Sequence, residues 1–151
     1  MEITNPNGSI VRFTSVNAKA VTADNVQYTG SIDNLSPFLE ELTLRGSHTG
    51  DVRNLSSRLT VLSIVGSPNV TITEGPLPRW SDCVIMLQNA WTTTEVDTFL
   101  NSWRNTCATG TVVRAINLAG TSSNANAPRS SASDDAVTDM AANHNKTFTF
   151  N

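Results

Sequence analysis

The sequence repeats itself with a period of twenty residues, and this repeat limits the folds that the chain can adopt. Residues 29–48 and residues 49–68 abut and are identical at nine positions. The identical pairs are Thr29/Thr49, Gly30/Gly50, Asn34/Asn54, Leu35/Leu55, Ser36/Ser56, Leu39/Leu59, Leu42/Leu62, Gly46/Gly66 and Ser47/Ser67. Tandem units of this length are typical of a solenoid in which each unit forms one turn.

The apolar residues of each unit predict one short strand per turn. In the skeleton L-x-x-L-x-[LI]-x-G, the second and third apolar positions have the two-residue period of a strand and share one face. The skeleton consists of Leu39, Leu42, Leu44 and Gly46, and then of Leu59, Leu62, Ile64 and Gly66. The residues expected to fill the return leg are Ile32, Leu35, Val52 and Leu55. One turn cannot cover its own apolar face, so we expect neighbouring turns to stack around a shared core.

Weaker copies of the skeleton flank the two clear units. Upstream, the equivalent positions are Ala18, Val21 and Ala23, with one extra residue before Thr29. Downstream, one copy contains Ile85, Leu87 and Asn89, and the last contains Val113, Ile116, Leu118 and Gly120. Five parallel strands in one stack are therefore expected.

Both ends of such a stack need caps, because a terminal turn would otherwise expose its core. At the amino end, the apolar residues Ile10, Val11, Phe13 and Val16 follow a turn signal at residues 5–8, which predicts a hairpin or paired edge strands. At the carboxyl end, residues 92–95 indicate a helix start, and the helix is predicted to end near residues 107–110. Its apolar stripe is Val96, Phe99, Leu100 and Trp103. A second helix is predicted from Ser133 through Ala141, followed by a final strand at residues 147–150.

The predicted architecture is one α/β domain of 151 residues. Residues 1–28 form an amino-terminal β cap, and residues 29–90 form the repeats around a parallel sheet of about five strands. Residues 91–151 form a carboxyl-terminal cap with two helices.

Charge and hydropathy exclude some classes of partner. The net charge is −3, and the ten lysines and arginines are scattered singly, which argues against nucleic acid as a partner. No run of eighteen apolar residues occurs, so we expect no insertion into a membrane. Residues 1–6 lack a basic region followed by an apolar stretch, so no secretory signal peptide is expected.

The repeats and the carboxyl-terminal segment resemble a known family. The skeleton matches the leucine-rich repeat at its shortest length. Residues 59–66 and 49–55 resemble the repeat of leucine-rich-repeat-like modules in tail-fibre and other virion-surface proteins of tailed phages, which also occur in bacterial surface proteins. The more specific matches are Trp80, Glu95-Val96-Asp97, Asn117-Leu118-Ala119-Gly120, Ala127-Pro128-Arg129 and Ser133-Asp134. The resemblance spans residues 29–151.

The resemblance implies a non-enzymatic, tail-fibre-type module on the surface of a phage particle, made in the host cytoplasm. The expected partners are other virion proteins, with a host surface glycan or protein as a further partner. Two alternatives stay open: a purely structural decoration or connector protein of the virion, and a bacterial leucine-rich-repeat protein that recognises other proteins. Self-assembly into a homo-oligomer also stays open.

The outward side of the strand stack is the predicted ligand surface, because strand alternation leaves these side chains outside the core. The candidates are Thr43, Arg45, Ser63, Val65, Met86, Gln88 and Asn117, with Ala119 beside them. This small, mixed and nearly uncharged face suits a glycan or a protein better than a nucleic acid. Trp91 is the aromatic residue that could stack on a sugar, although a role in the core is favoured.

Catalysis, cofactors and metal ions are not expected from the sequence. The serines lack the motif of an activated nucleophile, and the paired carboxylates Glu40-Glu41 and Asp134-Asp135 are neighbours whose side chains point apart. His48 and His144 are isolated and are interpreted as surface residues. Cys83 and Cys107 are expected to be buried thiols, with pairing left open.

Asn34 and Asn54 occupy equivalent positions in the two clear units. Asparagine side chains at such positions can satisfy backbone groups of the next turn. The sequence therefore predicts that these two residues hold neighbouring turns together.

Overall fold

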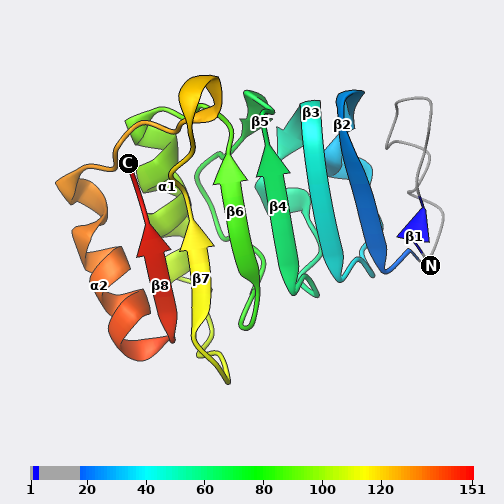
Figure 1. Cartoon of the computed structure of the whole chain (residues 1–151). Helices are drawn as coiled ribbons and strands as arrows, with labels where there is room; N and C mark the ends of the chain where they lie inside the picture. The colour runs from blue at the N-terminus through cyan, green and yellow to red at the C-terminus, as the bar shows by residue number, and fades with distance from the viewer. Residues whose placement is uncertain (1, 4–17) are drawn as a thin grey trace.

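The computed structural model describes residues 2–3 and 18–151, and these residues form an α/β fold around one parallel sheet (Figure 1). The strands are β1 (Glu2–Ile3), β2 (Ala20–Ser31), β3 (Glu41–Asp51), β4 (Val61–Val65), β5 (Asn69–Thr71), β6 (Val84–Gln88), β7 (Arg114–Asn117) and β8 (Lys146–Thr149). Their order is β1-β2-β3-β4-β6-β7-β8, and β5 pairs with the far end of β3. Every strand pair is parallel.

The strand register confirms the stacking of successive turns. Leu42 lies beside Leu62, and Leu62 lies beside Ile85. Their side chains are fully or almost fully buried, as are Leu44, Ile64 and Leu87 in the second row of the core. The expected return-leg residues Ile32, Leu35, Val52 and Leu55 are buried as well. Each such side chain stabilises the fold by about 1.5–3 kcal/mol.

Some details of the predicted stack are wrong. Within the described residues, the sheet has eight strands rather than about five: β1 and β5 join it, and so does β8, the predicted final strand. In the first turn, Thr29 lies beside Ser47 rather than Thr49, because the register shifts between Asp24 and Thr29. Val113 does not enter the core but is 63% exposed in the connection before β7. The predicted amino-terminal hairpin falls on residues 4–17, which lie outside the described residues.

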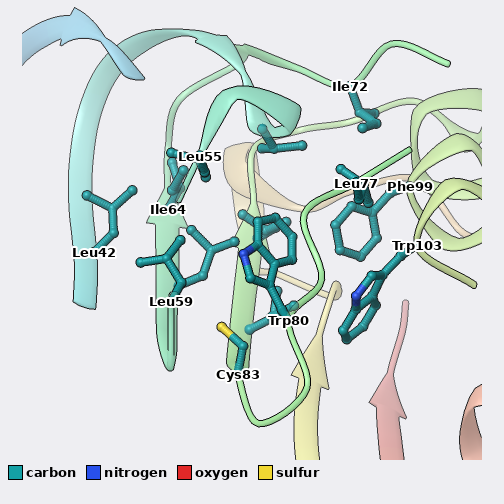
Figure 2. Close-up of a cluster of buried hydrophobic side chains, with 14 of the residues drawn as sticks. Leu42, Leu55, Leu59, Ile64, Ile72, Leu77, Trp80, Cys83, Phe99 and Trp103 are labelled. Atoms are coloured by element: carbon teal, nitrogen blue, oxygen red, sulfur yellow. The ribbon is translucent and has the colours of Figure 1, made fainter. Parts of the chain in front are cut away.

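Helix α1 (Thr93–Arg104) begins where the sequence predicts and ends three residues before the expected boundary. Its start is a capping box: the Thr92 hydroxyl accepts the Glu95 N–H at 3.3 Å, and the Glu95 carboxylate accepts the Thr92 N–H at 2.9 Å. The expected apolar stripe faces the core, where Phe99 and Trp103 contact each other with ring centroids 5.7 Å apart. Figure 2 shows these two rings beside Trp80 and Leu77, between the helix and the strands. Within the described residues, no helix is long and apolar enough to cross a membrane.

The carboxyl-terminal segment adds the second helix and an edge strand to the sheet. Helix α2 (Asp134–Asn143) and β8 occur close to the predicted positions, and β8 pairs with β7. Lys146 in β8 is 2% exposed, and its ammonium donates to the Ser81 carbonyl and lies 5.9 Å from the Trp103 ring centre. A buried ammonium needs such partners, because an unpaired charge in the core is costly.

Asn34 and Asn54 do not hold the turns together in the predicted way. Both are exposed, and Asn54 donates to the Asp33 carboxylate at 2.9 Å rather than to a backbone group. Three buried polar side chains outside the strands hold the turns together instead: Ser67 after β4, Asn89 after β6 and Asn126 in the connection after β7, which we call the polar ladder. The Ser67 N–H donates to Asn89 at 3.1 Å, and the Asn89 N–H donates to Asn126 at 3.0 Å.

Asn126 has the most contacts in the polar ladder. Its carboxamide oxygen accepts the N–H groups of Asn89 and Trp91, both at 3.0 Å. Its amide nitrogen donates to the carbonyls of Leu87 and Leu118, both at 2.7 Å. One side chain that is 2% exposed therefore satisfies four buried backbone groups from neighbouring turns.

His48 is not a surface residue, because its side chain is fully buried in β3. The alternation of this long strand brings position 48 inside, beyond the point where the repeat skeleton ends. Burial lowers the pKa of His48, and hydrogen bonding to the backbone at Arg45 and Gly30 offsets this only in part. His144 is half-buried, with Nε2 3.8 Å from the Asp139 carboxylate.

The polar ladder can be tested by comparing Asn126→Ala with Asn54→Ala. The first change leaves several buried backbone groups without a partner and should lower the free energy of unfolding by about 3 kcal/mol. The second removes one exposed hydrogen bond and should cost about 0.5 kcal/mol. Urea titration monitored by tryptophan fluorescence measures both values. Equal losses in the two variants would contradict this role of Asn126.

The burial of His48 predicts a loss of stability in mild acid. Its pKa is lower in the folded chain than the value of about 6.5 in the unfolded chain, so the unfolded state gains a proton first as the pH falls. Stability is therefore complete above about pH 6.5 and decreases below it. Thermal melts between pH 7.5 and 5 should show this decrease in the wild type and in His144→Gln. The decrease should be much smaller in His48→Gln; an unchanged slope in that variant would disprove the assignment.

Candidate functional site

The sheet brings all seven predicted ligand-binding residues to one surface, which we call the strand face. Its central row consists of Thr43, Ser63, Met86 and Asn117, which are direct neighbours in the sheet. The row beside it consists of Arg45, Val65 and Gln88. At about 4.8 Å per strand, the central row spans about 14 Å. Figure 1 shows this side of the sheet in front, with α1 behind it.

The strand face is apolar in the middle and polar around it. Val84 and Met86 of β6 are 39% and 38% exposed. On β4, half-buried Val61 lies beside Val84, Ser63 lies beside Met86, and half-buried Val65 lies beside Gln88. Thr43 and Asn117 flank this group, and the Asn117 carboxamide oxygen accepts the N–H of Ala119 at 3.1 Å. An apolar centre with a polar margin is typical of a surface that binds another protein.

A hollow of about 330 Å³ lies at the carboxyl end of β3 and β4, where the strand face ends. Arg45 and Val65 form one side of it, and Ser123 and Asn124 form the other. Gly66 adopts φ +78°, and a Cβ atom there would approach the Asn124 side chain to 3.4 Å. A side chain at position 66 would therefore be strained and would narrow the hollow.

The sequence did not predict this hollow. Residues 121–125 belong to a connection that joins β7 to the second helix, far from β3 in the chain. The connection is held in place because the Ala90 N–H donates to the Asn124 carbonyl at 3.3 Å and the Asn126 N–H donates to the Ala119 carbonyl at 3.2 Å. The only hint in the sequence is that glycine recurs at positions 46 and 66. Both residues have a positive φ, and neither has a side chain to fill the space at this edge of the sheet.

The acidic groups with shifted pKa values stabilise local structure. Partial burial would raise the pKa of Asp97, but hydrogen bonds from Ser130 and Ser133 outweigh it and hold the pKa below its usual range. The Ser130 hydroxyl donates at 2.5 Å and the Ser133 hydroxyl at 2.6 Å. Asp97 thus fastens the segment before α2 to α1. An ionised carboxylate whose oxygens are already occupied is poorly placed to accept a proton from a substrate.

The two thiols are buried, as the sequence predicts, and they do not form a disulfide, a point that the sequence left open. Burial raises the pKa of Cys83 to about 12 and that of Cys107 to about 11, so neither forms a nucleophilic thiolate near neutral pH. Within the part of the chain that the structure describes, no group of three or more His, Cys, Asp and Glu side chains could hold a metal ion. Trp91 belongs to the core: it is 1% exposed, and its indole N–H donates to the Val70 carbonyl at 2.6 Å.

Comparisons with known proteins add no relative. No protein-family model matches the sequence, and neither the curated proteins nor the solved structures gave a match.

The raised thiol pKa values predict slow chemical modification of the native protein. At pH 8, Ellman's reagent should label less than about one tenth of the thiols in an hour, because the thiolate is rare and enclosed. Both thiols should react within minutes in 6 M guanidinium. Cys83→Ala and Cys107→Ala assign the residual reactivity, which should belong mainly to Cys107. Rapid labelling of native Cys83 would contradict the burial described here.

Proposed function

We propose that this protein is a non-enzymatic recognition module of the tail-fibre or virion-surface type, which binds a partner protein through the strand face. The setting on a phage particle rests on the sequence resemblance to leucine-rich-repeat-like modules. The proposal that the partner is a protein and binds to the strand face rests on the structure of that surface. The observation that carries it is the exposed apolar centre of the strand face, formed by Val84 and Met86 within a polar margin.

The sheet is suited to such a role because it fixes its outward side chains. Parallel pairing sets the spacing between neighbouring side chains, and the buried rows beneath them set the register. A partner therefore meets a surface that loses little conformational entropy on binding. The single strong charge among the seven candidates is Arg45, which favours shape and apolar contact over electrostatic recognition.

The alternative role of a structural connector within a virion uses the same surface. In that case, the strand face is covered by a neighbouring virion subunit instead of a host protein. A bacterial repeat protein that binds other proteins is the second alternative, and it differs in genomic setting rather than in the surface used. All three roles share the expectation that a bulky charge in the apolar centre prevents binding.

Met86→Arg tests the strand face. Fluorescently labelled wild-type protein is incubated with a panel of bacterial strains and with purified virion proteins encoded beside it in its genome. Wherever the wild type binds, Met86→Arg should bind at least tenfold more weakly, because a long cation replaces an apolar contact at the centre of the interface.

The matched control is Thr138→Arg, which places the same side chain on an exposed position of α2. This control should bind like the wild type, and both variants should melt within a few degrees of it. Binding that Met86→Arg leaves intact would exclude the strand face as the contact surface.

A further inference from the structure

A second concave surface lies along α1, on the helix side of the sheet. This cleft, which we call the helix cleft, has a volume of about 700 Å³. Its walls are α1, the connection between β5 and β6 at residues 74–76, and the turn at residues 130–132. Its volume lies within the range of about 300–1,000 Å³ that is typical of sites for small molecules.

The walls of the helix cleft are fixed by hydrogen bonds that do not involve its open interior. Arg53 donates to the Glu74 carbonyl at 2.8 Å, which holds the connection between β5 and β6. Asn101 donates to the Ala132 carbonyl at 3.2 Å, and the Thr93 hydroxyl donates to the Pro128 carbonyl at 2.8 Å. A cleft held in this way is preorganised, so a ligand would not need to order its walls.

Four polar side chains along the helix cleft make no hydrogen bond with the described part of the chain: Thr94, Thr98, Ser102 and Asn105. They are separated by three or four residues, so they lie on one face of the helix. Ser102 is only 8% exposed, although its hydroxyl makes no hydrogen bond among the described residues. This face thus offers a line of hydroxyl and carboxamide groups that both donate and accept.

The charge of the helix cleft limits the ligands that fit it. No lysine, arginine or histidine side chain is among the described residues that line it, whereas Glu74 and Asp97 are. A phosphate or carboxylate group would therefore meet negative charge, because the nearest guanidinium groups, those of Arg53 and Arg129, are already paired with Asp51 and Asp134. A ligand rich in neutral hydroxyl groups can pair with each of the four unbonded side chains.

We propose that the helix cleft binds a neutral saccharide. Its hydroxyl groups would exchange hydrogen bonds with Thr98, Ser102 and Asn105, and Glu74 at the rim would accept from one further hydroxyl. This site is separate from the strand face and does not depend on the function proposed for that surface.

The test measures binding of neutral and acidic sugars to the full chain by NMR titration. The neutral probes are glucose, galactose, N-acetylglucosamine and maltose, and the acidic probes are N-acetylneuraminic acid and glucose 6-phosphate. At least one neutral sugar should bind with a Kd of about 10 mM or tighter, and both acidic probes should bind at least tenfold more weakly. Saturating shifts should be confined to residues of the helix cleft.

Variants locate the binding. Thr98→Ala and Asn105→Ala each remove one hydrogen-bonding group and should weaken the sugar about fivefold, the equivalent of about 1 kcal/mol. Thr138→Ala on α2 is the matched control and should bind like the wild type. Met86→Arg should also bind the sugar normally, because it alters the strand face alone.

Three results would overturn the proposal. One is no binding of any neutral probe at 50 mM by a wild-type chain that melts cooperatively. Another is acidic probes that bind as tightly as neutral ones. The third is a sugar affinity that Met86→Arg abolishes while Thr98→Ala and Asn105→Ala leave it unchanged, which would place the site on the strand face.

Discussion

Apolar side chains of successive turns bury one another, and the other features of the molecule depend on this contact. A single turn cannot enclose its own apolar residues, and Leu42 is fully buried with Leu62 beside it in the next strand. Because side chains alternate along a strand, the same contact fixes which residues point outward. A shift of β6 by one residue in its register with β4 would bury Met86 and expose Ile85 and Leu87. The strand face is thus the outer side of the core and cannot be altered independently of it.

The sequence was sufficient to predict the stacked turns but not all of their polar residues. The skeleton around Leu42 and Leu62 is visible because burial leaves a period of twenty residues. The pair Ser47 and Ser67 shows the limit of this reasoning: Ser47 is exposed and Ser67 is buried, although they occupy the same repeat position. The cause is local, since β3 continues to Asp51 whereas β4 ends at Val65 and the chain turns at Gly66.

The candidate sites also differ in whether the sequence could predict them. The strand face could be predicted because each of its residues follows from strand alternation within a single turn. The hollow beside Arg45 and the helix cleft could not be predicted. Each is lined by segments that lie far apart in the chain and are not copies of one repeat unit. The unbonded Thr94, Thr98, Ser102 and Asn105 do leave a helical pattern in the sequence. Only the structure shows that residues 74–76 and 130–132 line a cleft together with these four side chains.

The all-parallel sheet has a kinetic consequence. No two neighbouring strands among the described residues can be joined by a tight hairpin, because all of them are parallel, so each pairing must first close a long loop of chain. Sheets of this kind nucleate slowly compared with helical bundles of similar length. The bond from Lys146 to the Ser81 carbonyl closes one of the longest loops, and it forms against the ring of Trp103. During synthesis, β8 emerges after the other strands of the sheet and completes a core that stays partly open to water until then.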